Sequence, residues 1–460
     1  MKKYYVALSF LIPAIYRLDI EIYSWPFTIG FDTMAYYLPY LLGYDKYDVL
    51  QLYSQAPLYY ILISNLNIIV KNPMITIKVM AIILQGLLGL VLYLWSKSIL
   101  RSDDKAFIYS ILTSFYFVTL RLLWDLHRNV LGLVLMLFTL WLLNHDKYYN
   151  TKYFRCGIGF TAFLTALAHQ IEPVILSLLL IPKVIKRNIE ATIALFTTLI
   201  TWLSIVVSYS FVTDGTGYFE RLFIERDPLI PQGLEVLELA LYMFLPILPF
   251  SITGIIKNWR RNKELIIWII FCIAIAPFIN AGFRLLLLIT IPLMIYTITL
   301  NKKAITTLTT ITITLAIGYT LLPPENPFPY FTQPIMWNTK FKYAIPTSIQ
   351  QNTIPLNLSQ QVLKAMIQIL KKIKNEEGVI ITDRTFISYI LFINTSYRVK
   401  VCNEIFQESP ACIDVFKEKN CKLYLLWLSP KYKWHNLTLS KSFVEMICIE
   451  PISLYHLRCS

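Results

Sequence analysis

Long apolar runs separated by short polar stretches fill the first 322 residues of the chain. An α-helix needs about 20 apolar residues to cross a bilayer, and the longer runs reach that length. The first run is short, so Lys2 and Lys3 must snorkel to the interface. The pattern predicts a polytopic α-helical membrane protein with about eleven transmembrane helices. The predicted spans are 4–16, 75–95, 106–123, 130–143, 156–167, 173–185, 191–211, 236–256, 265–279, 285–300 and 304–322.

Two stretches depart from a simple series of crossings. Residues 57–70 are apolar for only fourteen positions, which favours an interfacial or re-entrant helix on the outer face. Residues 156–185 carry basic clusters at both ends and must cross an even number of times, which predicts two short helices that break around His169. Because non-helical backbone at membrane depth must line a cavity, this break indicates a site.

Charge orients the predicted spans. The chain is 56% hydrophobic and 15% charged with a net charge of +14, and the basic residues gather in alternate loops. This distribution follows the positive-inside rule and does not indicate a nucleic-acid partner. We therefore expect a cell-membrane protein with a cytoplasmic amino terminus. The predicted inside loops carry Lys97, Arg101, Lys105, Lys147, Lys152, Arg155, Lys183, Lys186, Arg187, Lys257, Arg260, Arg261, Lys263, Lys302 and Lys303. The outer loops carry Asp19, Glu21, Asp32, Asp45, Asp48, Asp125, Glu172, Asp214, Glu220, Glu225 and Asp227.

The composition changes after residue 322, where a proline-rich linker leads into a mixed polar sequence. We predict a membrane domain over 1–322, with a first outer loop at 18–74, and an exterior α/β domain over 323–460. Helices are expected at 359–374 and 385–393, strands at 378–382, 397–401 and 423–428, and a hairpin at 443–457. An odd number of crossings places this domain outside. The sequons at Asn357, Asn394 and Asn436 all lie in it and agree with that location.

Ionisable residues at helix mouths are expensive to keep near a membrane and are therefore functional candidates. Under the predicted topology they converge on the outer face. A carboxylate there can act as a general base, and arginine binds phosphate oxygens bidentately. A carboxylate with a histidine can also hold a divalent metal. The candidates are Asp32, Asp125, Arg128, His169, Glu172 and Arg284.

Each candidate has a structural alternative. Asp32 can cap a helix, and Asp125 can pair with Arg128 three residues later. His169 can be an interhelical hydrogen-bond donor, and Glu172 can favour the amino end of the following helix. Arg284 can snorkel to the headgroups.

The order of these parts resembles the GT-C glycosyltransferases, multi-span enzymes that use polyprenyl-phosphate sugars and include protein O-mannosyltransferases and aminoarabinose transferases. The first outer loop carries Gly30-Phe31-Asp32-Thr33. It is followed by Ala56-Pro57-Leu58-Tyr59-Tyr60, which is similar to the start of the family's juxtamembrane helix, and by Trp124-Asp125-Leu126 at the fourth span. The resemblance implies that Asp32 is the catalytic base or a metal ligand and that Asp125 is a supporting acid.

Two features depart from the family pattern. The family's paired Asp-Glu is Asp32-Thr33 here, and the tail has no Trp-Trp-Asp-Tyr-Gly motif. These departures favour a single-sugar transferase over an oligosaccharyltransferase. The function expected is transfer of a sugar from a polyprenyl-phosphate donor to an exterior glycan, lipid or protein acceptor. A membrane transporter or lipid flippase, and a catalytically inactive GT-C relative with an assembly role, are the other classes that fit.

Overall fold

The computed structural model divides into two compact units, which are described separately here. Unit 1 comprises Met1–Tyr23, Tyr47–Lys71 and Lys78–Ile349, and unit 2 comprises Ser24–Lys46, Asn72–Ile77 and Gln350–Ser460. The residues that the structure describes are 2–144, 152–212, 229–260, 262–279, 282–332, 345–372, 379–382, 384–393, 398–401, 423–428 and 443–457. The loop acids at 214–227 and the sequons at Asn394 and Asn436 therefore lie outside them.

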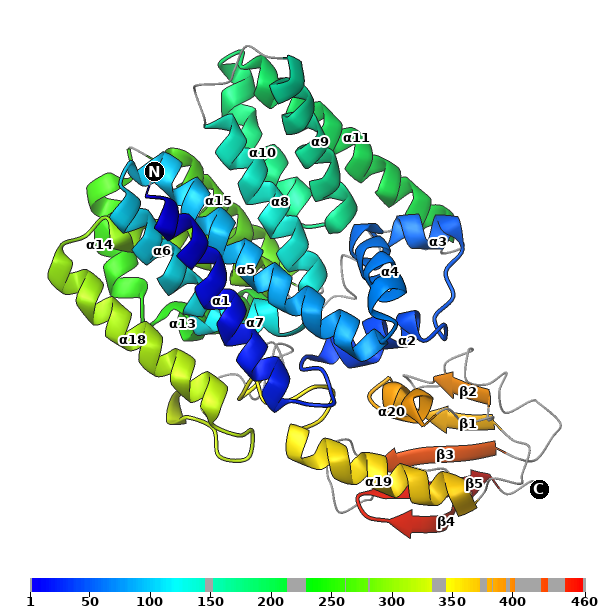
Figure 1. Ribbon diagram of the computed structural model, residues 1–460. Helices are drawn as coiled ribbons and strands as arrows, with labels where there is room; N and C mark the ends of the chain where they lie inside the picture. The colour runs from blue at the N-terminus through cyan, green and yellow to red at the C-terminus, as the bar shows by residue number, and fades with distance from the viewer. Residues whose placement is uncertain are drawn as a thin grey trace. The chain divides into compact units, whose positions relative to one another are not determined.

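Helices make up the regular structure of unit 1 (Figure 1). They are α1 (Lys3–Tyr23), α3 (Val49–Ser54), α4 (Leu58–Val70), α5 (Pro73–Leu100), α6 (Asp103–Phe115), α7 (Phe117–Asp125), α8 (His127–Leu143), α9 (Lys152–Ala168), α10 (Glu172–Ile185) and α11 (Ile189–Val212). The series continues with α13 (Leu229–Phe244), α14 (Leu248–Asn258), α15 (Lys263–Ile275), α16 (Phe283–Leu288), α17 (Thr290–Ile298) and α18 (Lys302–Leu321). Only the first turn of α5 falls in unit 2.

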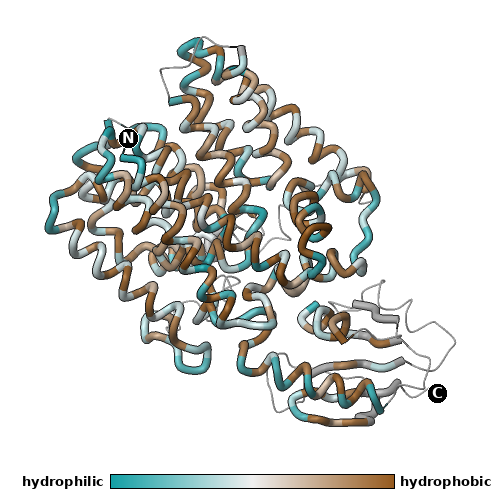
Figure 2. Tube along the Cα trace, viewed as in Figure 1, coloured by the Kyte–Doolittle hydropathy of each residue, from teal (hydrophilic) through white to brown (hydrophobic). Residues whose placement is uncertain are grey.

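Every predicted apolar span contains a helix, which confirms a helical protein of membrane type. Hydrophobic residues run along these helices, and polar residues gather toward their ends (Figure 2). By length and composition, α5, α11 and α18 are long and apolar enough to cross a membrane. The number rises to five if α6 with α7, bent by 61°, and α13 with α14, bent by 94°, each count as one span. Eleven crossings stay a prediction.

The first helix extends further than its apolar run. Helix α1 continues to Tyr23, so Arg17, Asp19 and Glu21 are helical residues and not members of a loop. Arg17 and Glu21 lie one turn apart on the buried side of α1, where each can reach an opposite charge. A hydropathy pattern ends the span at residue 16 because it scores these charges as solvent-exposed.

Two glycines allow helices of unit 1 to approach closely. A Cβ built on Gly89 of α5 would lie 2.2 Å from the carbonyl oxygen of Ser9 in α1. A Cβ on Gly254 of α14 would lie 2.2 Å from the carbonyl oxygen of Tyr296 in α17. Small residues at such crossings let helix backbones pack without the hydrophobic driving force that water provides.

Unit 2 contains a five-stranded sheet in the order β2-β1-β3-β5-β4. Strand β1 (Val379–Thr382) pairs in parallel with β2 (Arg398–Val401) and β3 (Leu423–Leu428), while β5 (Ile452–Leu457) is antiparallel to β3 and β4 (Phe443–Ile449). Helix α20 (Ile387–Phe392) connects β1 to β2, as a parallel pair requires. Helix α19 (Leu356–Lys372) packs its apolar face on the β4–β5 hairpin. The predicted helices and strands of the tail are thus confirmed.

Unit 2 also includes a segment from the opposite end of the chain. Residues 24–46, with the single-turn π-helix η1 (Thr33–Tyr37) and the short helix α2 (Leu38–Leu41), belong to it by their contacts. Backbone N–H of Gly30 donates to the carbonyl oxygen of Gln351 at 3.0 Å. The domain boundary at residue 323 stays a prediction. The structure adds to it the association of residues 24–46 with the tail.

The close packing of α1 on α5 gives a stability prediction. Gly89→Ala places a methyl group against the backbone of Ser9, so the helices must separate, at a cost of about 1–3 kcal/mol. We expect a lower midpoint of thermal unfolding in detergent. Gly157→Ala in α9 is the matched control, because its Cβ would meet no atom within 4 Å. An unchanged midpoint for Gly89→Ala would contradict the observed packing.

Candidate functional site

A buried polar cluster occupies the break between α9 and α10. Helix α9 ends at Ala168, and α10 begins at Glu172 with Pro173 in its first turn, so the predicted break around His169 is confirmed. Nδ1 of His169 lies 2.7 Å from Oε2 of Glu172, and Nδ2 of Asn129 lies 3.1 Å from the same imidazole nitrogen and 3.4 Å from Oε1 of Glu172. The short contact between His169 and Glu172 requires a proton between the two atoms.

Helix α8 is shaped to admit the carboxylate of this cluster. A Cβ on Gly132 would lie 3.0 Å from Oε2 of Glu172 and 3.2 Å from its carboxyl carbon. Asn129 and Gly132 lie one turn apart on α8 and face the same carboxylate. Asn129 contacts the Glu172 carboxylate, and Gly132 leaves space for it. Glu172 is completely buried, and a buried carboxylate is kept only where its hydrogen bonds are satisfied.

Two arginines, Arg128 and Arg284, lie near this cluster. The charges of Arg128 and Arg284 both act on the imidazole of His169, so the start of α8 and the start of α16 lie near the break. The guanidinium of Arg128 stacks on the ring of Tyr60, 5.4 Å from its centre. Tyr59, the neighbour of Tyr60 in α4, places its hydroxyl 2.8 Å from Nδ1 of His127. Tyr59 and Tyr60 of α4 therefore both contact the beginning of α8.

Asp125 is paired with Arg121 and not with Arg128. Both side chains are about 4% exposed, and one Arg121 nitrogen donates a short hydrogen bond to Oδ1 of Asp125. The guanidinium of Arg121 also lies over the rings of Trp124 and Phe283, at 4.9 and 5.7 Å. Asp125 thus has a buried structural partner at the end of α7. Through Phe283 this pair adjoins the helix that carries Arg284.

A second buried ion group joins α1, α5 and α7. Arg17 pairs with Glu21 at 2.8 Å, and Lys78 reaches the other oxygen of Glu21 at 3.1 Å. Arg17 also donates to the carbonyl oxygen of Leu123 at 2.7 Å, two residues before Asp125. Sequence reasoning did not select these residues as candidates. The signal available was the i, i+4 spacing of Arg17 and Glu21 directly after an apolar run.

Asp32 belongs to unit 2 and immediately precedes η1. Its backbone is right-handed helical, its side chain is half-buried, and its carboxylate makes no capping hydrogen bond to η1. The helix-cap alternative therefore does not account for this residue. A single π-helical turn is uncommon in proteins and often accompanies a functional site.

Thr33, the residue directly after Asp32, has a structural role. It is completely buried, and its hydroxyl lies 2.7 Å from the carbonyl oxygen of Ile29 and 2.6 Å from that of Gly30. The Thr28 hydroxyl lies 3.1 Å away. Gly30 takes a φ of +97°, a backbone conformation that favours glycine. The Thr33 hydroxyl, bonded to the carbonyl oxygens of Ile29 and Gly30, therefore closes a tight turn before Asp32.

Side chains of the tail hold the segment after Asp32. Arg384 binds both oxygens of Asp45, at 3.0 and 2.8 Å, and donates to the carbonyl oxygen of Ala35 at 3.4 Å. Its guanidinium lies over the ring of Tyr36, 5.3 Å from the centre. Ser388 donates to the carbonyl oxygen of Met34. We call these four contacts the Arg384 clamp, and they fix the backbone of η1 from a position about 350 residues away in sequence.

A buried hydrogen-bond network around Tyr389 adjoins the Arg384 clamp, because Tyr389 directly follows Ser388 in α20. The hydroxyl of Tyr389 lies 2.8 Å from Oδ1 of Asn352 and 2.9 Å from the hydroxyl of Ser359. Burial raises the pKa of Tyr389, so its phenol keeps the proton that this network needs. The ring of Tyr389 also packs on that of Phe27, with centres 5.4 Å apart.

The six predicted residues therefore fall into two groups. Unit 1 holds Asp125, Arg128, His169, Glu172 and Arg284 around the α9–α10 break, the end of α7 and the starts of α8 and α16, while unit 2 holds Asp32. Within the described residues, no three His, Cys, Asp or Glu side chains are placed to hold a metal ion. No protein-family model and no curated protein matches the sequence.

The Arg384 clamp predicts a local loss of order. Arg384→Ala removes charge-assisted hydrogen bonds that typically contribute about 2 kcal/mol, so the segment around η1 and α2 should open more often. We expect faster amide hydrogen exchange at residues 35–46 of the full chain, with little change in α5. Lys364→Ala, an exposed cation on α19, is the control of equal charge. Equal exchange in both variants would show that the clamp does not hold the segment.

Proposed function

We propose that the protein is a membrane glycosyltransferase of the GT-C type, which moves a sugar from a polyprenyl-phosphate donor to an exterior glycan, lipid or protein acceptor. The observation that carries the proposal is the polar cluster of unit 1, in which the charges of Arg128 and Arg284 act on the imidazole of His169, the partner of the buried Glu172. Ionisable groups retained inside an apolar helix bundle favour a functional site.

The arginines suit a phosphate group. Arg128 makes no ion pair within the described residues and stacks on Tyr60, so its nitrogens are not committed to a carboxylate there. In the proposed reaction the bond between the anomeric carbon and the phosphate oxygen breaks, and its electron pair remains on the phosphate. Arg284 and Arg128 stabilise the charge that accumulates on that leaving group.

Asp32 is the proposed base. The acceptor hydroxyl or amide attacks the anomeric carbon as its proton passes to the carboxylate of Asp32, and the configuration of that carbon inverts. The clamped backbone after Asp32 supports this role, because a base must be held in position. Asp125, whose carboxylate is paired with Arg121, is proposed to support the arginine side of the site.

A catalytically inactive relative is the second candidate, and Thr33 is the observation that favours it. Its hydroxyl is engaged with two backbone carbonyls, so the family's second acid has been replaced by a structural residue. An inactive relative would bind the lipid phosphate without transferring a sugar. The two candidates therefore differ in turnover and not in binding.

Binding of polyprenyl phosphate, the product shared by all such donors, tests the phosphate site without knowledge of the sugar. Arg284→Ala should weaken that binding at least about tenfold, since hydrogen bonds to a charged group contribute roughly 1.5–3 kcal/mol. The measurement is titration of the purified full chain in nanodiscs. Lys302→Ala, which removes an exposed cation at the start of α18, is the control. If Arg284→Ala binds as tightly as wild type, the phosphate role of this residue is wrong.

A further inference from the structure

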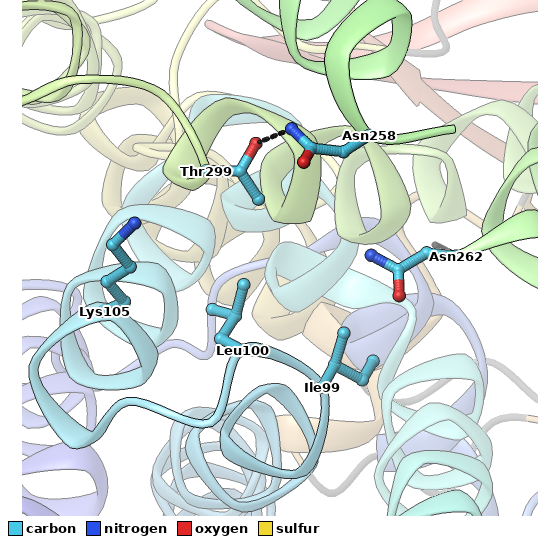
Figure 3. A pocket seen from close by; sticks show the side chains of 6 residues that line it. All are labelled: Ile99, Leu100, Lys105, Asn258, Asn262 and Thr299. Atoms are coloured by element: carbon cyan, nitrogen blue, oxygen red, sulfur yellow. Dashed lines mark hydrogen bonds between the residues drawn. The ribbon is translucent and has the colours of Figure 1, made fainter. Parts of the chain in front are cut away.

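A small polar cavity of about 120 Å³ lies in unit 1 among the ends of five helices (Figure 3). It is lined by Ile99 and Leu100 at the end of α5, Lys105 in α6, Asn258 at the end of α14, Asn262 before α15 and Thr299 after α17. None of these residues belongs to the cluster at the α9–α10 break.

The hydrogen bonds within the cavity determine what it can offer a ligand. Nδ2 of Asn258 donates to the hydroxyl of Thr299 at 2.9 Å and to the carbonyl oxygen of Gly254 at 3.2 Å. The Thr299 hydroxyl in turn donates to the carbonyl oxygen of Tyr296 at 2.6 Å. This arrangement fixes the amide of Asn258 and leaves its oxygen as an acceptor. The ammonium of Lys105 and the amide of Asn262 add donors from the other sides of the cavity.

The charge around the cavity selects an anion. Among the described residues no carboxylate lines it, and the two acids nearest to Lys105 in sequence are already paired. Asp103 binds Lys97 at 2.6 Å and the Tyr93 hydroxyl at 2.6 Å, while Asp104 binds Lys2 at 2.8 Å. The positive charge of Lys105 is therefore not offset by either neighbour.

The helix next to the cavity has the surface of a membrane interface. On α14 and the residue after it, Ile256 is 70% and Trp259 is 45% exposed, on either side of the cavity residue Asn258. Arg260 and Lys263 place their charges 5.5 and 5.9 Å from the centre of the Trp259 ring. A tryptophan flanked by basic residues is typical of the headgroup level of a bilayer, and exposed isoleucine suits contact with acyl chains.

We infer that this cavity binds the phosphodiester of an acidic phospholipid headgroup that also carries hydroxyl groups. Lys105 and the amide of Asn262 receive the phosphate oxygens, and the oxygen of Asn258 accepts from a headgroup hydroxyl. Basic pockets between helices, at the end that carries the basic loops, are known to recognise such headgroups. This lipid site is separate from the site of the proposed transfer reaction.

The test compares lipid binding by variants of the full-length protein. Wild type, Lys105→Gln and Lys105→Arg are exchanged into nanodiscs of phosphatidylcholine containing a small fraction of phosphatidylglycerol, and retained lipid is measured by native mass spectrometry. Lys105→Gln should retain phosphatidylglycerol about fivefold less, the factor that one lysine near a membrane surface contributes, and Lys105→Arg should restore it. Lys302→Ala, an exposed cation at the start of α18, is the control.

Inorganic phosphate in a parallel titration distinguishes the two sources of the same chemistry. Displacement of phosphatidylglycerol from wild type by millimolar phosphate, with no such displacement in Lys105→Gln, would support the anion site with free phosphate as its ligand. No competition, together with Lys105-dependent retention of phosphatidylglycerol, supports the lipid headgroup. If Asn262→Leu also folds and both it and Lys105→Gln retain phosphatidylglycerol as wild type does, the inference is overturned.

Discussion

Charged side chains buried among apolar helices must be paired, and much of unit 1 follows from that constraint. A carboxylate or guanidinium that loses its partner in such a place costs several kcal/mol. Glu21 is accordingly held by Arg17 and Lys78, Asp125 by Arg121, and Glu172 by His169 and Asn129. Each group bridges helices or stands where one helix stops and the next begins.

The three groups are linked to one another through the chain. Arg17 binds the carbonyl oxygen of Leu123 near the end of α7, which fixes the helix end that carries Asp125. Arg121 packs on Phe283, the first residue of α16 and the neighbour of Arg284. Arg284 in turn acts on His169 at the α9–α10 break. The arginines proposed to bind phosphate are thus supported by residues whose own charges are already satisfied.

The helices of unit 1 could be predicted because apolar runs dictate them, and the tail elements because strand and helix patterns alternate clearly there. Charge partners could not. A pair between Asp125 and Arg128 assumes one continuous helix, but α7 ends at Asp125 and α8 begins at His127, so Arg121 is the partner within the same helix. The bond between Arg384 and Asp45 joins residues more than 300 positions apart, and no local pattern indicates it.

Sugar transfer by an Asp32 variant tests the proposed enzyme most directly. The full chain in nanodiscs would be supplied with polyprenyl-phosphate sugars and membrane acceptors, and the release of polyprenyl phosphate followed. Asp48→Asn is the matched control, since asparagine keeps the helix cap that Asp48 provides to α3. We predict transfer by wild type and Asp48→Asn and its loss in Asp32→Asn without loss of membrane insertion. Full activity in Asp32→Asn would contradict it.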